Sequence, residues 1–341
     1  MGSLTRISLL LVIIIPIVML VVVNYNESHE ISTSTTTNKV LRTPLEIYEA
    51  NRLEQKLNAK IFKGSLLHMH IPKCAGASLN RELSWKCKDF KFFSNEVCHD
   101  YLKREEKNMI EKFNFTKNIF TTMLRDPIAH VYSQYLECKY DKWGKTVTYN
   151  TSFPRDYSDI EGFDLWLDHF NETWNIKRGF FKCYIPYNAQ TRAFTCTGGN
   201  NHYLTYTSKF IDYKINDPLY PDIDIAMNNS LQFHAIGFVE YYDASICLFL
   251  YKLYDQLNEE CQNLCNKNNI VNEDNNNNNN NKVFHERHNV PEHNTSSLSP
   301  SIINKIERLT KNDNILYNNL LQRFLNDIKY IENKYSAKLL C

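Results

Sequence analysis

Residues 65–79 read S-L-L-H-M-H-I-P-K-C-A-G-A-S-L, and this stretch decides the fold of the chain. The apolar run Leu66–Ile71 has the length and the β-branched end of a buried parallel strand, and Pro72 ends it. Leu79–Leu83 then has the pattern of the first turns of a helix. Strand, short loop and helix are the repeating unit of parallel α/β proteins. The stretch therefore predicts an α/β fold.

The loop between this strand and helix is expected to bind an anion. A helix N-terminus offers unpaired N–H groups, and a glycine such as Gly76 lets the backbone approach a ligand closely. Lys73 adds a cation and Ser78 adds a hydroxyl group. Lys73 precedes Gly76, whereas the Lys of a Walker A loop follows its glycines. The loop is therefore predicted to be a phosphate site of a different kind.

A second strand and helix repeat this arrangement. Residues 118–124, N-I-F-T-T-M-L, have the pattern of a strand that leads directly into Arg125. Asp126 is expected to cap the next helix, with Pro127 at its first position. Ligands of open parallel sheets bind at the carboxyl ends of strands, so Arg125 and Ser133 are predicted to hold a second phosphate. A local Arg125–Asp126 pair and a merely packed Ser133 are the alternative.

The remaining hydrophobic patterns predict a P-loop-like parallel β-sheet that is flanked by helices. Further strands are expected at Phe90–Phe93 and Phe233–Val239. Helices are expected at residues 101–113, 163–170, 188–194, 222–231, 243–257, 299–309 and 314–335. Residues 139–221 are otherwise aromatic and irregular, and residues 266–282 are an Asn-rich low-complexity insert.

The N-terminal region has the pattern of a membrane anchor. Residues 7–23 are apolar apart from Ser8 and Pro16 and follow Arg6, which predicts a transmembrane signal anchor with residues 1–6 in the cytoplasm. Residues 24–43 are expected to form a polar stem, and residues 44–341 a lumenal domain. A cleaved signal peptide is the alternative, but its small-residue cleavage pattern is missing. Sequons for N-glycosylation, which fit a lumenal domain, occur at Asn26, Asn114, Asn150, Asn171, Asn228 and Asn294.

Composition limits the classes of partner. The net charge of +1 gives no basic character for nucleic-acid binding, so no nucleic-acid partner is expected. A polyanionic glycan would need a local basic surface. The residues that offer one, unless they belong to solvated helix faces, are Lys103, Arg104, Lys107, Lys112, Lys139, Lys142 and Lys145.

The cysteine pattern favours disulfides over metal. The chain has 10 Cys and no C-x-x-C pair, which argues against a zinc ribbon, and no metal is expected. In a lumenal domain disulfides are favoured. Cys87 with Cys98, and Cys183 with Cys196, are near enough in sequence to close small loops, although sequence leaves the pairing open.

Together the two phosphate motifs resemble those of a known enzyme family. The P-K-x-x-G-x-S of residues 72–78, followed by R-D-P at 125–127 and Ser133, is similar to the Golgi membrane-bound carbohydrate sulfotransferases that use 3′-phosphoadenosine 5′-phosphosulfate (PAPS). This group includes heparan sulfate 2-O- and 6-O-sulfotransferases. The resemblance implies a single-pass type II protein of the Golgi membrane that transfers a sulfuryl group from PAPS to a glycan hydroxyl, with no metal.

The resemblance also implies roles for individual residues. Arg125 and Ser133 would bind the 3′-phosphate of PAPS. Lys73 would act in catalysis as well as in binding. The 5′-phosphosulfate would be held by Lys73 and by the backbone of Cys74, Ala75, Gly76, Ala77 and Ser78. Asn188–Arg192 looks like an N-x-Q-x-R segment of the family, in which Arg192 would help to line the cleft. Residues 287–295 lie where the family places a loop that closes on PAPS.

A proton acceptor for the glycan hydroxyl is expected to be His99. It lies between a predicted strand and a predicted helix, where the 2-O- and 6-O-sulfotransferases carry their proposed catalytic His. A neutral imidazole accepts a proton in a mildly acidic lumen. The alternatives are His70, or a carboxylate such as Glu96 or Asp100.

Two other functions remain open from sequence. A lumenal nucleotide-sugar glycosyltransferase would suit the anchor equally well, but the D-x-D triplet at 222–224 falls in a predicted helix. A glycan-binding protein that has lost turnover is the non-enzymatic alternative. The acceptor glycan and the oligomeric state are not predicted.

Overall fold

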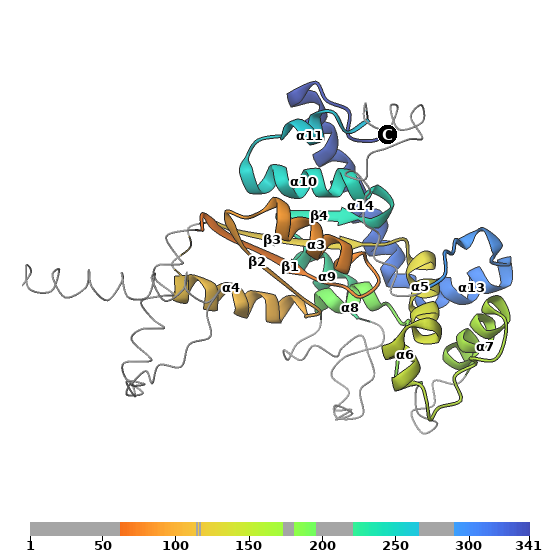
Figure 1. Cartoon of the computed structure of the whole chain (residues 1–341). Coiled ribbons are helices and arrows are strands. Elements are labelled where there is room, and N and C mark those ends of the chain that lie inside the picture. Colours follow the sequence, from red (N-terminus) through yellow and green to blue (C-terminus); the bar gives the residue numbers. More distant parts are fainter. Residues whose placement is uncertain (1–61, 114, 116, 173–180, 196–220, 266–289) are drawn as a thin grey trace, which may run out of the picture. The chain divides into compact units, whose positions relative to one another are not determined.

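The fold is built on a four-stranded parallel sheet with the strand order β2-β1-β3-β4 (Figure 1). The strands are β1 (Gly64–Met69), β2 (Phe90–Asn95), β3 (Asn118–Leu124) and β4 (Ala235–Phe238). Their buried faces follow from the apolar runs in the sequence, and every residue of β1 is buried. The prediction of an α/β fold with a parallel sheet flanked by helices is confirmed.

The computed structural model describes residues 62–113, 115, 117–172, 181–195, 221–265 and 290–341. All of these belong to one compact unit. Within these ranges no helix combines the length and the apolar character that a membrane span requires. The expected anchor (7–23), the stem (24–43) and the Asn-rich insert (266–282) lie outside the described residues.

The described helices follow the predicted pattern, with shifted ends. They are α3 (Gly76–Lys86), α4 (His99–Phe113), α5 (Pro127–Tyr140), α6 (Lys142–Val147), α7 (Asp159–Glu172), α8 (Ala189–Thr195), α9 (Ile223–Ser230), α10 (Tyr242–Tyr254), α11 (Glu259–Gln262), α13 (Pro300–Leu309) and α14 (Lys311–Tyr335), with 3-10 turns η2 (Val239–Tyr241) and η3 (Thr295–Ser297). Two starts matter for the site, because α3 begins at Gly76 and α4 at His99. The short helices α6 and α11 were not predicted.

Helices cover both faces of the sheet. On one face α3 and α10 lie together, where the hydroxyl of Tyr242 donates to the carboxylate of Glu82 at 3.0 Å. On the other face α4 and α8 pack against each other, and α14 runs along β4 (Figure 1). This arrangement buries a first hydrophobic core around both faces of the sheet.

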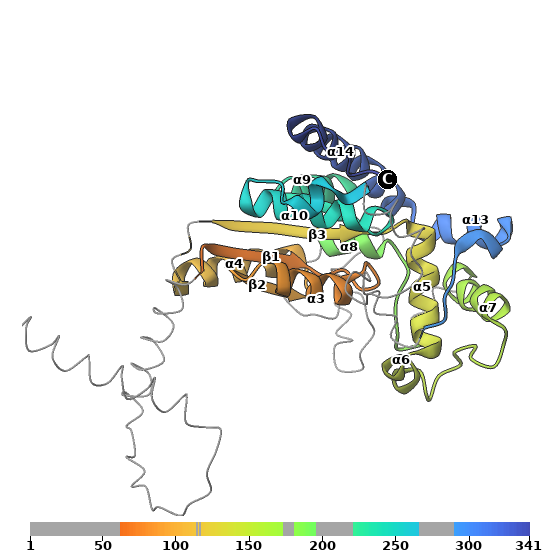
Figure 2. The same cartoon turned by 45° about the horizontal axis from the view of Figure 1, so that its top comes forward.

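A second core lies beyond the carboxyl ends of the strands. It is made by α5, α7 and α13, which Figures 1 and 2 show gathered on one side of the sheet together with α6. Its centre is aromatic: Tyr135, Phe163 and Trp166 are fully buried, with ring centroids 5.3 to 6.1 Å apart. The core around the sheet and this aromatic core therefore meet at the carboxyl ends of the strands.

The strand order predicts a ligand-binding crevice at the carboxyl ends of β1 and β3. From β1 the chain moves outward to β2 on one side, whereas β3 and β4 lie on the other side of β1. The chain therefore leaves β1 and β3 in opposite directions, and this topological switch point is where open α/β sheets bind their ligands.

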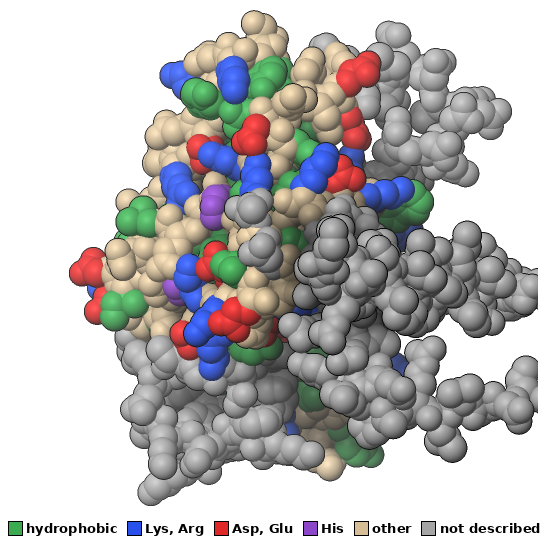
Figure 3. Space-filling view, turned by 90° about the vertical axis from the view of Figure 1, so that its left-hand side faces the viewer, with side chains coloured by type: hydrophobic (Ala, Val, Ile, Leu, Met, Phe, Trp, Pro, Cys, Tyr) green, Lys and Arg blue, Asp and Glu red, His purple; other side chains and the backbone are tan. Residues whose placement is uncertain are grey.

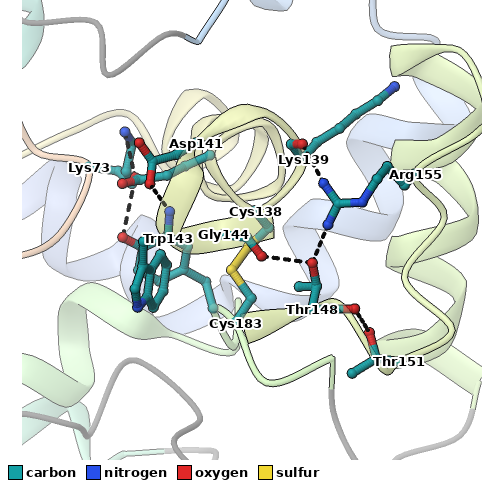
Figure 4. Close-up of a disulfide and its surroundings, with 12 residues drawn as sticks. Lys73, Cys138, Lys139, Asp141, Trp143, Gly144, Thr148, Thr151, Arg155 and Cys183 are labelled. Atoms are coloured by element: carbon teal, nitrogen blue, oxygen red, sulfur yellow. Dashed lines mark hydrogen bonds and ion pairs between the residues drawn. A yellow bond between two sulfur atoms is a disulfide. The ribbon is translucent and has the colours of Figure 1, made fainter. Parts of the chain in front are cut away.

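Three disulfides tie the described elements together. Cys138 of α5 bonds Cys183 (Figure 4), Cys247 bonds Cys261, and Cys265 bonds Cys341. The pairs suggested by closeness in sequence are wrong. Cys87 is free, and Cys183 bonds Cys138 across 45 residues because packing of the second core brings their Cα atoms to 6.0 Å.

Charged surface residues are interspersed rather than separated by sign. Figure 3 shows Lys and Arg among Asp and Glu on one face. Along α4, Lys103 lies 2.9 Å from Glu106, and Arg104 lies 3.7 Å from Asp100. Lys139 is buried against Asp159 at 2.7 Å. Lys103, Arg104 and Lys139 thus each lie beside an acidic side chain.

Removing the Cys138–Cys183 bond should destabilise the protein. This bond closes a loop with a sequence separation of 45, for which loop-closure entropy corresponds to about 4 kcal/mol of unfolding free energy. We expect Cys138→Ala/Cys183→Ala to lose most of this amount in denaturant unfolding without reductant. Cys87→Ala, which removes a buried free thiol, should cost only about 1 kcal/mol. Equal losses in the two variants would contradict this role of the bond.

Candidate active site

A cavity of about 300 Å³ opens where β1 and β3 end. Side chains from both βα units, from α5 and from residues 290–293 face it. Its lining residues are His70, Lys73, Ala75, Gly76, Ala77, Ser78, Glu96, Arg125, Ser133, Glu137, Tyr184, Val239, Val290, Pro291, Glu292 and His293. The two motifs that the sequence separates by about fifty residues therefore meet at one cavity.

The loop after β1 has the geometry of an anion cradle. Lys73 and Ala75 have positive φ angles of 66° and 61°, and the N–H of Cys74 donates to the carbonyl of Ile71 at 3.1 Å. Alternation of this kind turns successive backbone N–H groups toward one side. The helix α3 begins at Gly76, so its first N–H groups have no acceptor within the helix and face the cavity end.

The ring of His70 occupies the space beside Gly76. A Cβ atom built on Gly76 would overlap the imidazole of His70, which lines the same cavity. The glycine therefore provides close approach between the end of β1 and the start of α3, as well as access for a ligand.

Arg125 is fixed by contacts with distant parts of the chain. Its Nη1 donates to the carbonyl of Lys73 at 3.2 Å, which joins the two loops directly. The side chain of Gln190 accepts from the N–H of Arg125 at 3.0 Å and donates to its carbonyl at 2.8 Å. Asp313 in turn accepts from the N–H of Gln190 at 3.2 Å and of Thr191 at 2.7 Å. Burial raises the pKa of Asp313 to about 6.

The helix after Arg125 starts as predicted. Asp126 caps α5 by accepting the N–H of Ala129 at 2.9 Å, and Pro127 occupies the first turn. Ser133 lies farther along α5, is 2% exposed and lines the cavity with Arg125. The expected pairing of Arg125 with Ser133 at one site is therefore present in the geometry.

Lys73 and two glutamates form the charged centre of the cavity. The Nζ of Lys73 lies 2.6 Å from Oε2 of Glu137, and both side chains are 13% exposed (Figure 4 shows Lys73). The hydroxyl of Tyr184 donates to the same carboxylate at 3.2 Å. Burial, together with the charge of Glu137, raises the pKa of Glu96 to about 7, and the charge of Lys73 opposes this rise. Glu96 thus exchanges its proton near neutral pH.

The side chain of His130 supports the loop after β1. Its Nε2 lies 2.8 Å from the carbonyl oxygen of Pro72, within the loop after β1. Burial lowers the pKa of His130 to about 3, so the ring is neutral and its N–H donates to that carbonyl. His130 therefore holds the loop and does not face the cavity.

Three residues that were expected at the site have other surroundings. His99, in the first turn of α4, is 6% exposed and its ring centroid lies 5.9 Å from that of Phe233. Burial lowers its pKa. Arg192 is buried and donates to the carbonyl of Ile185 at 2.8 Å. Cys74, of which only the backbone was expected to bind the donor, has its side chain buried toward Gln190. The described residues that line the cavity include none of the three side chains.

Several cavity residues were not singled out as site residues from sequence. Glu137 lies one helical turn after Ser133, so helical spacing was an available signal. Glu96 follows the last residue of β2, and it was considered only as an alternative base. Tyr184 follows the disulfide cysteine Cys183, and sequence had no signal for its position. Of residues 287–295, those from 290 to 293 line the cavity, whereas 287–289 lie outside the described residues.

Among the described residues, no group of three or more His, Cys, Asp or Glu is arranged to hold a metal ion.

A comparison of the chain with protein-family models, with curated proteins and with solved structures found no match.

Gly76→Ala should destabilise the protein through His70. Overpacking of this kind typically costs about 1–3 kcal/mol, which denaturant unfolding measures. Adding His70→Ala removes the obstructing ring, so the double variant should recover more than half of that loss. Simple addition of the two single effects would show that the ring does not occupy this space.

Proposed function

We propose that this chain is a PAPS-dependent carbohydrate sulfotransferase with a P-loop-like donor site. The observation that carries this proposal is the meeting of two motifs at one cavity: Lys73, Gly76 and Ser78 after β1, and Arg125 and Ser133 after β3. A donor with phosphate groups at both its 5′ and 3′ positions requires two such anion sites. The family resemblance of the same residues supports the assignment.

In this proposal the two anion sites bind different groups of the donor. The ammonium of Lys73, the hydroxyl of Ser78 and the N–H groups at the start of α3 hold the 5′-phosphosulfate. The N–H groups proposed for this role belong to residues from Ala75 to Ser78, since that of Cys74 donates to the carbonyl of Ile71. Arg125 and Ser133 hold the 3′-phosphate, for which a planar guanidinium donates in pairs.

The reaction exchanges one bond to sulfur for another. The oxygen of a glycan hydroxyl attacks sulfur, and the bond between sulfur and the bridging phosphate oxygen breaks. The electron pair of that bond goes to the departing nucleotide, 3′-phosphoadenosine 5′-phosphate, and the hydroxyl proton goes to a base. Lys73 stabilises the charge that develops on the leaving phosphate. No metal takes part in the proposed step.

Glu96 is the base that the geometry favours. It lines the cavity, and its pKa of about 7 suits proton transfer near neutral pH. His99, the acceptor expected from the family resemblance, packs against Phe233. His99 remains the alternative in the test below.

The disulfides support a lumenal location. The Cys138–Cys183, Cys247–Cys261 and Cys265–Cys341 bonds form in oxidising compartments such as the secretory pathway. They accord with the proposed anchor at residues 7–23 and with a catalytic domain in the Golgi lumen.

The glycosyltransferase alternative gains no support from the D-x-D triplet. The carboxylate of Asp222 caps α9 by accepting from the N–H groups of Asp224 at 2.8 Å and Ile225 at 3.1 Å. Neither Asp222 nor Asp224 is among the described residues that line the cavity. An inactive glycan-binding protein would bind the nucleotide without turning PAPS over.

The 3′-phosphate site is tested by calorimetry with two nucleotides. Wild-type protein should bind 3′-phosphoadenosine 5′-phosphate, and Arg125→Ala should weaken this binding at least about tenfold, since a charged hydrogen bond contributes roughly 1.5–3 kcal/mol. Binding of adenosine 5′-phosphosulfate, which has no 3′-phosphate, should change little. Failure of the wild-type protein to bind the first nucleotide would reject the proposed function. Equal weakening of both nucleotides would reject the role of Arg125.

The base is tested by matched substitutions. Glu96→Gln should lower turnover by about 10²–10⁴ while nucleotide binding persists, and His99→Gln should retain most activity. The reverse pattern, with His99→Gln inactive and Glu96→Gln active, would restore His99 as the base.

A further inference from the structure

The ammonium of Lys73 forms an ion pair with Glu137. Its contact with Glu137 is short, at 2.6 Å, and both side chains are mostly buried. Tyr184 donates to the same carboxylate oxygen, which helps to fix it in place. A phosphosulfate bound at the start of α3 needs this ammonium, so donor and Glu137 compete for one cation.

The charged and titratable groups around this ion pair come from every element that borders the cavity. Two cations and two imidazoles face three glutamates and one phenol. They are Lys73 and His70 after β1, Glu96 after β2, Arg125 after β3, Glu137 of α5, Tyr184, and Glu292 and His293 of the segment 290–293. The carboxylates Glu96 and Glu137 interact electrostatically with each other and with Lys73.

Donor binding changes the balance within this set. Once Lys73 turns to the phosphosulfate, Glu96 and Glu137 lose their shared counter-ion and face a polyanionic ligand. Two neighbouring carboxylates with little access to water do not both stay ionised under such conditions. The pair therefore takes one proton from solvent, which Glu137 holds once it has lost Lys73, while Glu96 stays ionised as the base.

Building on the proposed function, we propose that Glu137 is a positioning residue that holds Lys73 until the donor binds, and that its release couples donor binding to the uptake of one proton by the Glu96–Glu137 pair. Glu137 thereby sets the donor affinity without touching the reacting atoms.

The direction of the pH dependence follows from Glu96. Below pH 7 Glu96 is already protonated in the free protein, so binding adds little. Above pH 7 Glu96 is ionised before the donor arrives, so nearly a full proton is taken up. Uptake should therefore rise from about 0.1 proton at pH 6 to about 0.9 proton at pH 8.

Calorimetry with 3′-phosphoadenosine 5′-phosphate in buffers of different ionisation enthalpy measures this number. The slope of the observed enthalpy against the buffer enthalpy is the number of protons taken up. For wild-type protein we expect the rise between pH 6 and pH 8 given above. Binding without uptake at pH 8, or with the same uptake at both pH values, would overturn the inference and leave the proposed function intact.

Three variants separate the role of Glu137 from general charge effects. Glu137→Gln should bind the nucleotide about tenfold more tightly at pH 8 and take up less than about a third of the wild-type proton number. Lys73→Ala should also lose uptake but bind more weakly. Glu292→Gln removes the same charge from the cavity wall and leaves the Lys73 ion pair, so its uptake should match wild type.

Wild-type uptake in Glu137→Gln or in Lys73→Ala, or its loss in Glu292→Gln, would refute the proposal. If wild-type protein binds no nucleotide, the proposed function itself fails and this inference fails with it.

Discussion

The parallel register of β1 and β3 is the constraint on which the whole site depends. Met69 lies opposite Thr122, whose hydroxyl donates to the carbonyl of Met69 at 2.8 Å. Since the strands run side by side and end together, the two loops that follow them emerge as neighbours. The hydrogen bond from Arg125 to the carbonyl of Lys73 is a direct result. A shift of one residue in this register would turn the side chains of β3 to the opposite face and would separate the two anion sites.

Support for this edge comes from parts of the chain far away in sequence. Gln190 holds the backbone of Arg125, Asp313 holds that of Gln190, and His130 holds the loop that contains Pro72. These polar groups are buried, so each is costly unless paired, and the pairing specifies one arrangement of the loops. The sheet core and the aromatic core beyond it are thus joined through hydrogen bonds as well as through apolar packing.

Local patterns made much of this architecture predictable. The strand at 118–124, the cap at Asp126 and the cluster of Lys73, Gly76 and Ser78 depend on neighbouring residues, which sequence displays directly. By contrast, the Lys73–Glu137 ion pair and the Cys138–Cys183 bond join elements whose approach is decided by tertiary packing.

For His99, a small error in the predicted start of a helix changes the expected position of a site residue. Sequence placed the start of its helix at residue 101, whereas α4 begins at His99 itself. A residue in the first helical turn directs its side chain by helix geometry, and here the ring of His99 packs against Phe233. The carboxylate of Glu96, which precedes this helix, lines the cavity instead.

The bond between Cys265 and Cys341 gives the last quarter of the chain an unusual covalent connectivity. It joins the end of the chain to a cysteine 76 residues earlier, so α13, α14 and the cavity segment 290–293 all lie on one closed covalent ring. A single peptide-bond break anywhere on that ring, including within the Asn-rich insert, opens it without releasing a fragment. Under oxidising conditions the wall of the cavity thus stays covalently attached to the sheet after such a break.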